Sequence, residues 1–307
     1  MKTLSFTLGV SVLLVSFAGA EELRLSFTET DGELAINVDG RPIASYVYAD
    51  KDILRPYFAH VKAPGSIQVT RNHPPLAGDR DDHATMHPGI WLAFGDLGGA
   101  DFWRNRAQVE HVKFIQLPAA ERNVGSFIEQ KRYVRPDGSV VCNEEFRVAI
   151  RAQEDGYAFY LESHFSADNE FSFGDQEEMG LGIRVATPIS EIGGGTLTDS
   201  TGRQGAQQIW SHSAAWCDYS GSVDGQHVGM TIMCHPANFR ASWFHARDYG
   251  LIAANPFGRA AMQKGEVSHV VIKPGEKHVL RYAVWIHGGV DVETITSVYN
   301  EYAKLGQ

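Results

Sequence analysis

The chain has 307 residues, with 27 Lys and Arg against 37 Asp and Glu, so its formal net charge is −10 at neutral pH. Nucleic acids and anionic membrane surfaces bind proteins through patches of lysine and arginine, and this charge therefore argues against both as partners. Acidic polysaccharides are also disfavoured as bulk partners, although a local pocket lined by arginine can still bind one.

Residues 1–20 have the pattern of a signal peptide. Lys2 supplies a positive charge, residues 4–17 are mostly apolar, and Ala18-Gly19-Ala20 fits the small-residue cleavage rule. The apolar run is too short to favour a membrane span. We therefore expect a periplasmic or secreted protein without membrane insertion, in which residues 21–307 form a single domain.

The three cysteines are Cys142, Cys217 and Cys234. Because their number is odd, at most one intramolecular disulfide can form, and Cys217 with Cys234 is the favoured pair. Three buried thiols are the alternative. The sequence leaves both open.

Alternation of apolar and polar residues predicts β-strands along most of the mature chain. Turn signals such as Asp39-Gly40 and Pro136-Asp137-Gly138 separate them. Near the end, apolar residues from Val292 to Leu305 recur at helical spacing, with Asp291 placed to cap the helix. The predicted strands are residues 23–28, 34–38, 43–48, 67–70, 90–94, 111–117, 126–134, 140–150, 157–165, 182–186, 208–216, 228–233, 269–272 and 278–287. We therefore expect an all-β fold, a large antiparallel β-sandwich (supersandwich-like) with a short C-terminal helix.

Residues 71–103 form the stretch richest in titratable and aromatic side chains, and they include His73, His83, His87 and Trp103. Their Gly and Pro content predicts a long ordered loop, and such loops are usually functional. The His-x3-His spacing of His83 and His87 would place both rings on one face of a helix, but Pro88 disfavours a helix there. The two histidines are therefore either site residues, as metal ligands or acid–base groups, or donors that hold the loop together.

A second cluster spans residues 235–257, and a carboxylate-bearing strand begins near Glu178. In a sandwich these elements can converge on one concave sheet face, where aromatic rings and hydrogen-bonding side chains suit a carbohydrate. The predicted catalytic residues are His83, His87, His235, His245 and Glu178. The predicted substrate-binding residues are Arg55, Trp103, Arg184, Trp216, Arg247 and Asn255.

Several motifs taken together resemble the PmoA-like family of exported bacterial proteins. They are Asp82-His83, His87-Pro88-Gly89-Ile90-Trp91, Asp101-Phe102-Trp103, residues 178–184, Trp216-Cys217-Asp218-Tyr219, His235-Pro236, Arg247-Asp248-Tyr249-Gly250 and Asn255-Pro256-Phe257-Gly258. The resemblance implies a soluble β-sandwich associated with sugar use. The membrane monooxygenase subunit to which the family name alludes needs several apolar spans, and no such span follows residue 20.

The leading hypothesis is a carbohydrate-active enzyme that acts on a small-molecule or oligosaccharide substrate by hydrolysis, elimination or epimerisation. No Gly-x-Ser-x-Gly elbow supports covalent serine catalysis. One alternative is a non-catalytic sugar-binding module. Another is a metal-dependent enzyme, in which His83, His87 and one of His73, His235 or His245 bind a divalent metal such as zinc, copper or iron as the cofactor.

Overall fold

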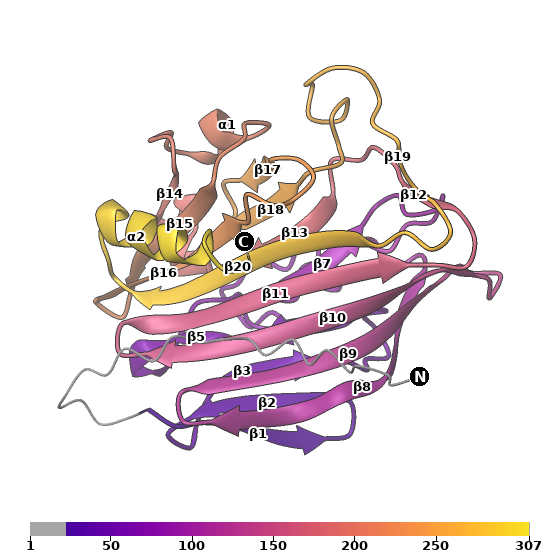
Figure 1. The fold of residues 1–307 in the computed structure, drawn as a ribbon. Helices are drawn as coiled ribbons and strands as arrows, with labels where there is room; N and C mark the ends of the chain where they lie inside the picture. Colours follow the sequence, from indigo (N-terminus) through magenta and orange to yellow (C-terminus); the bar gives the residue numbers. More distant parts are fainter. Residues whose placement is uncertain (1–22, 307) are drawn as a thin grey trace.

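A computed structural model describes residues 23–306 of the chain (Figure 1). The predicted signal peptide, residues 1–20, lies outside these residues. In the described part, two eight-stranded antiparallel sheets stack face to face and form a β-sandwich. This confirms the predicted fold class.

The first sheet is the rear layer in Figure 1. Its N-terminal half is a meander, as the Asp39-Gly40 turn predicted, and its other half is assembled from segments far apart in the chain. Its strands in spatial order are β1 (Leu25–Thr30), β2 (Glu33–Val38), β3 (Arg41–Val47), β4 (Tyr57–Ala59), β7 (Ile90–Phe94), β13 (Met179–Arg184), β18 (Leu251–Asn255) and β17 (Trp243–Arg247).

The second sheet is the front layer in Figure 1 and contains the longest strands. In spatial order they are β14 (Thr196–Asp199), β15 (Trp216–Val223), β16 (Gln226–Cys234), β20 (His278–Gly288), β11 (Gly156–Ser166), β10 (Val140–Gln153), β9 (Val124–Val134) and β8 (Gln108–Glu121). Two small hairpins pair β5 (Lys62–Ala63) with β6 (Ile67–Gln68) and β12 (Phe171–Phe173) with β19 (Val270–Ile272). The short helical elements are η1 (Pro64–Ser66), η2 (Thr187–Ile189), η3 (Glu191–Gly193) and α1 (Ala206–Ile209).

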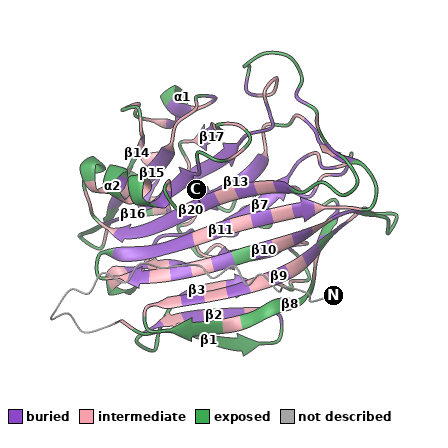
Figure 2. Cartoon of the chain, in the orientation of Figure 1, coloured by how far each residue is buried: buried purple, intermediate pink, exposed green. Residues whose placement is uncertain are grey.

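The core lies between the sheets because each strand turns alternate side chains inward. On β20, Leu280, Tyr282, Val284 and Ile286 are buried in this core, as the alternation predicted. Figure 2 shows the same alternation of buried and partly exposed residues along the front strands.

The outer face of the second sheet is partly covered by helix α2 (Val292–Tyr302), which buries Trp216 and Trp285. The side chain of Asp291 accepts a hydrogen bond from the Thr294 N–H, which confirms the predicted helix cap. Within residues 23–306, no helix has the length and apolar character needed to cross a membrane.

The strand predicted over residues 208–216 is wrong. Residues 206–209 form the single turn α1, Ser211 has a positive φ of 66°, and β15 begins only at Trp216. The carboxylate of Glu191 accepts a hydrogen bond from the Ala206 N–H at the start of that turn. This contact joins residues 15 positions apart, and the local alternation of apolar residues could not indicate it.

All three cysteines are buried free thiols, so of the two alternatives that the sequence left open, three buried thiols are confirmed and a Cys217–Cys234 disulfide is not formed. Burial raises the pKa of each thiol, and raises that of Cys234 to about 12. The thiols are therefore protonated and unreactive in the folded protein.

We predict that a thiol titration without reductant detects three free thiols per chain once the protein is unfolded, and reacts with the native protein only slowly. A mass spectrum after alkylation in denaturant should show three adducts. Finding a single adduct would contradict the assignment, because it would mean that two cysteines are paired.

Candidate active site

The floor of the site is the outer face of the first sheet, turned away from the core. The strand register places Trp91, Gly182, Ala253 and His245 side by side across β7, β13, β18 and β17. A Cβ atom on Gly182 would lie 2.6 Å from Cζ2 of Trp91 and 3.0 Å from Cη2 of Trp103. The absence of a side chain at Gly182 therefore lets the two indoles lie over the neighbouring strand.

Four aromatic rings stack upward from this floor. The His87 ring lies parallel to Trp91 at 5.0 Å between centroids, and His83 lies on His87 at 4.8 Å. Tyr249 continues the stack beyond His83 at 6.1 Å. His87 is fully buried, whereas the side chain of His83 is 37% exposed. Only one of the two predicted histidines therefore reaches the surface.

A single turn of chain creates this stack. The His87 N–H donates to the His83 carbonyl at 2.9 Å, which gives the two residues the relation they would have in a helix. Pro88 then ends the turn, as its effect on the preceding residue predicts. The His-x3-His spacing thus has a structural consequence although no helix forms over residues 83–87.

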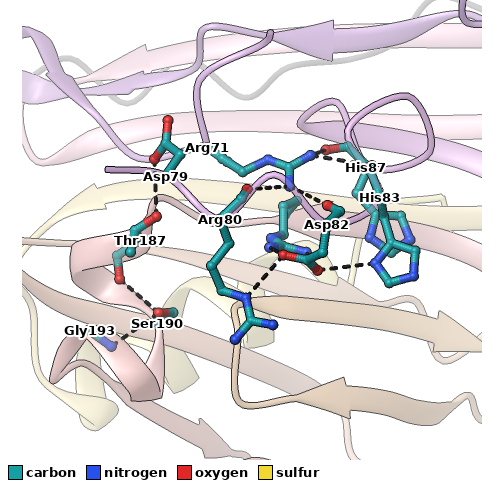
Figure 3. Close-up of polar contacts among 10 residues, drawn as sticks. Arg71, Asp79, Arg80, Asp82, His83, His87, Thr187, Ser190 and Gly193 are labelled. Atoms are coloured by element: carbon teal, nitrogen blue, oxygen red, sulfur yellow. Dashed lines mark hydrogen bonds and ion pairs between the residues drawn. The ribbon is translucent and has the colours of Figure 1, made fainter. Parts of the chain in front are cut away.

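Two buried arginines hold this turn in place through its backbone. Arg71 donates to the carbonyls of Arg80 and Asp82 from one guanidinium nitrogen and to that of His87 from the other (Figure 3). Arg55 donates to the carbonyls of Met86 and Trp103. Burial lowers the pKa of Arg71 to about 10 and that of Arg55 to about 9. Both guanidiniums stay charged at neutral pH.

Asp82 is the centre of the polar contacts above the stack (Figure 3). Its carboxylate accepts two hydrogen bonds from Arg184, at 3.0 and 3.2 Å, one from Arg80 at 3.1 Å, and contacts Nδ1 of His83 at 3.1 Å. Partial burial raises the pKa of Asp82, but the bonds from Arg184, His83 and Arg80 outweigh burial and hold the pKa well below its usual range.

The contact with Asp82 determines which nitrogen of the neutral His83 ring carries the proton. A carboxylate only accepts hydrogen bonds, so Nδ1 of His83 must carry the proton, and Nε2 keeps its lone pair. No residue in the described chain hydrogen-bonds that Nε2. His83 is therefore an oriented base with its reactive nitrogen free.

His87 has a different state. Its Nε2 faces the Trp103 indole N–H at 3.4 Å, and since the indole only donates, Nδ1 of His87 carries the proton. Burial lowers the pKa of His87 well below its ordinary value, and the nearby charges of His83, Arg184, Arg55 and Arg71 lower it further. His87 is therefore a neutral ring beneath His83.

Glu178, immediately before β13, lies near His83. Its carboxylate forms an ion pair with Arg104, and its side chain is 17% exposed. Burial raises the pKa of Glu178, while Arg104 and His83 oppose that rise. Glu178 therefore holds a proton to higher pH than an ordinary glutamate, as a general acid requires.

The neighbouring Glu177 is engaged by three partners. It accepts hydrogen bonds from Trp210 at 2.6 Å and Arg247 at 2.8 Å, and Nδ1 of His245 lies 3.4 Å from it. Burial raises the pKa of Glu177, but its partners lower it overall. His245 is buried, and burial lowers its pKa to about 4. Its ring is therefore uncharged at neutral pH.

The predicted site residues fall into three groups. His83, Glu178 and Arg247 reach the surface of the site. His87, His245, Arg55, Trp103, Arg184 and Asn255 lie buried beneath or beside it. His235 and Trp216 lie on the second sheet, where His235 contacts the Leu305 carbonyl and packs on Tyr302.

Three of the predicted substrate-binding residues are buried and contact the protein itself. Arg55 donates hydrogen bonds to backbone carbonyls, and Trp103 is fully buried. Asn255 donates to the carbonyls of Gln176 and Glu177 and accepts from the N–H groups of residues 257 and 258. These buried side chains position the site.

The predicted metal site is not formed. Among the described residues, no group of three or more His, Cys, Asp or Glu is arranged to hold an ion. The His83 and His87 rings stack with planes only 27° apart. Their lone pairs lie in those planes and cannot meet at the distance of about 2 Å that zinc needs from each nitrogen.

Asp82, Arg104, Glu177 and Tyr249 belong to the site but were not among the predicted catalytic or substrate-binding residues. His245 and Arg247 alternate along β17 and share a face, and Tyr249 follows in the turn after that strand, so its closeness in sequence to Arg247 is the one signal that could have identified it. Nothing local indicates Arg104, whose contact with Glu178 joins two distant segments.

We predict that Asp82→Asn destabilises the fold by about 1–3 kcal/mol at pH 7, because it removes charge-assisted hydrogen bonds. The folded pKa of Asp82 is lowered, so its stabilising contribution is present above the unfolded pKa of about 3.9 and is lost as pH falls toward the folded pKa. Urea unfolding at several pH values should therefore show the difference from wild type shrinking below about pH 4. Asp81→Asn, an exposed neighbour, is the control, and a pH-independent difference for Asp82→Asn would contradict this account.

Arg71→Met should cost on the order of 3 kcal/mol of stability, because it leaves buried carbonyls of the turn without donors. Amide hydrogen exchange should accelerate across residues 80–87. Arg80→Met removes an arginine that is half exposed and should cost less than about 1 kcal/mol. Equal effects of the two substitutions would show that Arg71 does not hold the turn.

Comparisons with known proteins give a family and distant likenesses to solved structures. The galactose 1-epimerase from Lactobacillus acidophilus NCFM has a TM-score of 0.44 at 7% identity, over 87% of this chain and 100% of that protein. An aldose epimerase homologue from C. elegans has a TM-score of 0.36 at 8% identity, over 86% and 99%. A beta-arabinopyranosidase has a TM-score of 0.35 at 11% identity, over 88% of this chain, which spans 39% of that protein.

No curated protein matches the sequence. The resemblance to the PmoA-like family stays a prediction. Residues 33–300 match the family of unknown function DUF6807, and the chain belongs to that family.

Proposed function

We propose that the protein is an exported carbohydrate-active enzyme that transfers protons on a sugar, with His83 as the base and Glu178 as the acid. The observation that carries the proposal is the pairing of His83 with Asp82. That contact leaves Nε2 of His83 free and basic at the surface of the site. Export rests on the signal-peptide pattern of residues 1–20.

The base and the acid have complementary environments. Asp82 orients His83 and stabilises the imidazolium that forms when Nε2 takes a proton. Glu178 is kept protonated to higher pH by burial and can return a proton to an oxygen of the substrate. Groups whose environments separate their protonation states in this way are typical of acid–base pairs.

The side chains around this pair suit a ligand with many hydroxyl groups. Arg247 and Glu177 form a partly exposed ion pair that offers donors and acceptors in fixed positions. Arg104 offers donors in the same way beside Glu178, and the half-buried Trp210 supplies a ring surface. Charged groups that bind hydroxyls, together with aromatic rings, favour a sugar over an apolar ligand.

Among the three reactions that the sequence suggested, the site favours epimerisation or elimination. Hydrolysis in most glycosidases needs two available carboxyl groups across the scissile bond. Here Asp82 is bound to Arg184, Arg80 and His83, and Glu177 is bound to Arg247 and Trp210. Glu178 is also paired, with Arg104, but burial outweighs that pair and raises its pKa, whereas the pKa values of Asp82 and Glu177 are lowered. Glu178 is therefore the carboxyl group that can carry the proton, and one base with one acid suffices for proton transfer.

Turnover is tested with a panel of reducing sugars and uronic-acid oligosaccharides in D2O, followed by proton NMR. We expect deuterium incorporation, anomeric exchange or an unsaturated product with the wild type. His83→Asn and Glu178→Gln should each lower the rate by about 10²- to 10⁴-fold while the circular dichroism spectrum is retained. His227→Asn, an exposed histidine on the second sheet, is the matched control and should retain full activity. Unchanged turnover in His83→Asn would overturn the assignment, and binding without turnover in the wild type would favour the sugar-binding module.

The pH profile tests the acid separately. Because Arg104 lowers the pKa of Glu178, Arg104→Met should raise that pKa further. Glu178 would then stay protonated to higher pH, so the alkaline limb of kcat/KM should move to higher pH. A limb that stays in place or moves to lower pH would exclude Glu178 as the acid.

A further inference from the structure

A second hollow, of about 350 Å³, lies on the other sheet of the sandwich. That volume is within the range of about 300–1,000 Å³ that small-molecule sites occupy. The lining of the hollow includes Lys113, Gln130, Asn143, His164, Ser166 and Lys277.

The register of four strands builds the hollow on the outer face. Lys113 of β8 pairs with Gln130 of β9, which pairs with Glu145 of β10, which pairs with His164 of β11. The adjacent residues Glu144 and Phe165 point into the core and are fully buried. The alternation therefore directs this polar row away from the core. In Figure 1 these strands are the front layer, below α2.

The side chains that line the hollow carry an excess of positive charge, because among the described residues its glutamates are paired and its lysines are not. Glu145 is paired with Arg147, and the buried Glu144 is paired with Lys131 at 3.0 Å. Within residues 23–306, Lys113 and Lys277 form no ion pair. A chain with a net charge of −10 thus presents two unpaired lysines around one hollow. Such a local excess of positive charge attracts an anion.

We propose that this hollow binds an acidic oligosaccharide, with carboxylates at Lys113 and Lys277 and hydroxyl groups at the side chains between them. Lys113 lies on β8, and Lys277 immediately precedes β20. These strands are four strand spacings apart, or roughly 19 Å at about 4.8 Å per spacing. That span exceeds a single sugar ring. Gln130, Asn143 and Ser166 supply neutral donors and acceptors between the two lysines.

This inference goes beyond the proposed function, because the hollow and His83 lie on opposite sheets. The two can fail independently. A chain with both sites would hold an acidic polymer on one face while His83 acts on a sugar at the other.

Isothermal titration calorimetry of the full mature chain with tetragalacturonate tests the proposal. We expect saturable binding, weakened at least about tenfold in the double variant Lys113→Gln/Lys277→Gln, since two charge-assisted contacts are lost. Lys264→Gln, which removes the same charge from an exposed position outside the hollow, should bind like the wild type. His83→Asn should also bind unchanged, which separates this site from the proposed catalytic one.

Two further probes identify the chemistry that is recognised. A neutral galactose tetrasaccharide should bind at least about tenfold more weakly than tetragalacturonate, and inorganic phosphate should bind more weakly still. Equal binding of phosphate with the same dependence on the two lysines would mean a simple anion site and would overturn the proposal. Absence of binding by the wild type, or full binding by the double lysine variant, would overturn it as well.

Discussion

The site depends on the buried guanidinium of Arg71, which donates hydrogen bonds to backbone carbonyls within residues 80–87. A turn rich in polar groups cannot lie on a sheet face unless its carbonyls find donors. Arg71 supplies several donors from one side chain, and Arg55 supplies more from the opposite side. Because these bonds fix the backbone of the turn, the rings of His83 and His87 stack above Trp91 and the Asp82 carboxylate faces Arg184.

Neutrality of His87 is the second requirement. Arg55, Arg71 and Arg184 surround the stack, and a further buried positive charge would be repelled by all three. A neutral ring lying flat between Trp91 and His83 instead adds packing without charge. His83 and His87, four residues apart, therefore have different roles. One is a buried support, and the other is an exposed base oriented by Asp82.

Much of the fold follows from local pattern, because alternation and turn residues report directly on strands. The strand at residues 90–94, the inward face of β20 and the Asp291 cap were all predicted. Which of the polar residues reach the surface of the site has no local signal, because burial is a tertiary property. Arg55 and Asn255 look like ligand-binding groups in a loop-rich sequence, yet both bind backbone. His235 was expected near His245, ten residues on, but β16 pairs with β20 in the second sheet while β17 pairs with β18 in the first. Strand order of this kind has no local signature.

The most direct test of the central claim is the position of the imidazole protons, measured by long-range nitrogen–proton NMR on histidine-labelled protein under conditions where the rings are neutral. The structure predicts a proton on Nδ1 in both His83 and His87, with Nε2 of His83 unprotonated and open to solvent. His87 should remain neutral as the pH is lowered through the ordinary histidine pKa of about 6.5, because burial and three arginines oppose its charging. A proton on Nε2 of His83 would make that nitrogen a donor and would contradict its role as the base.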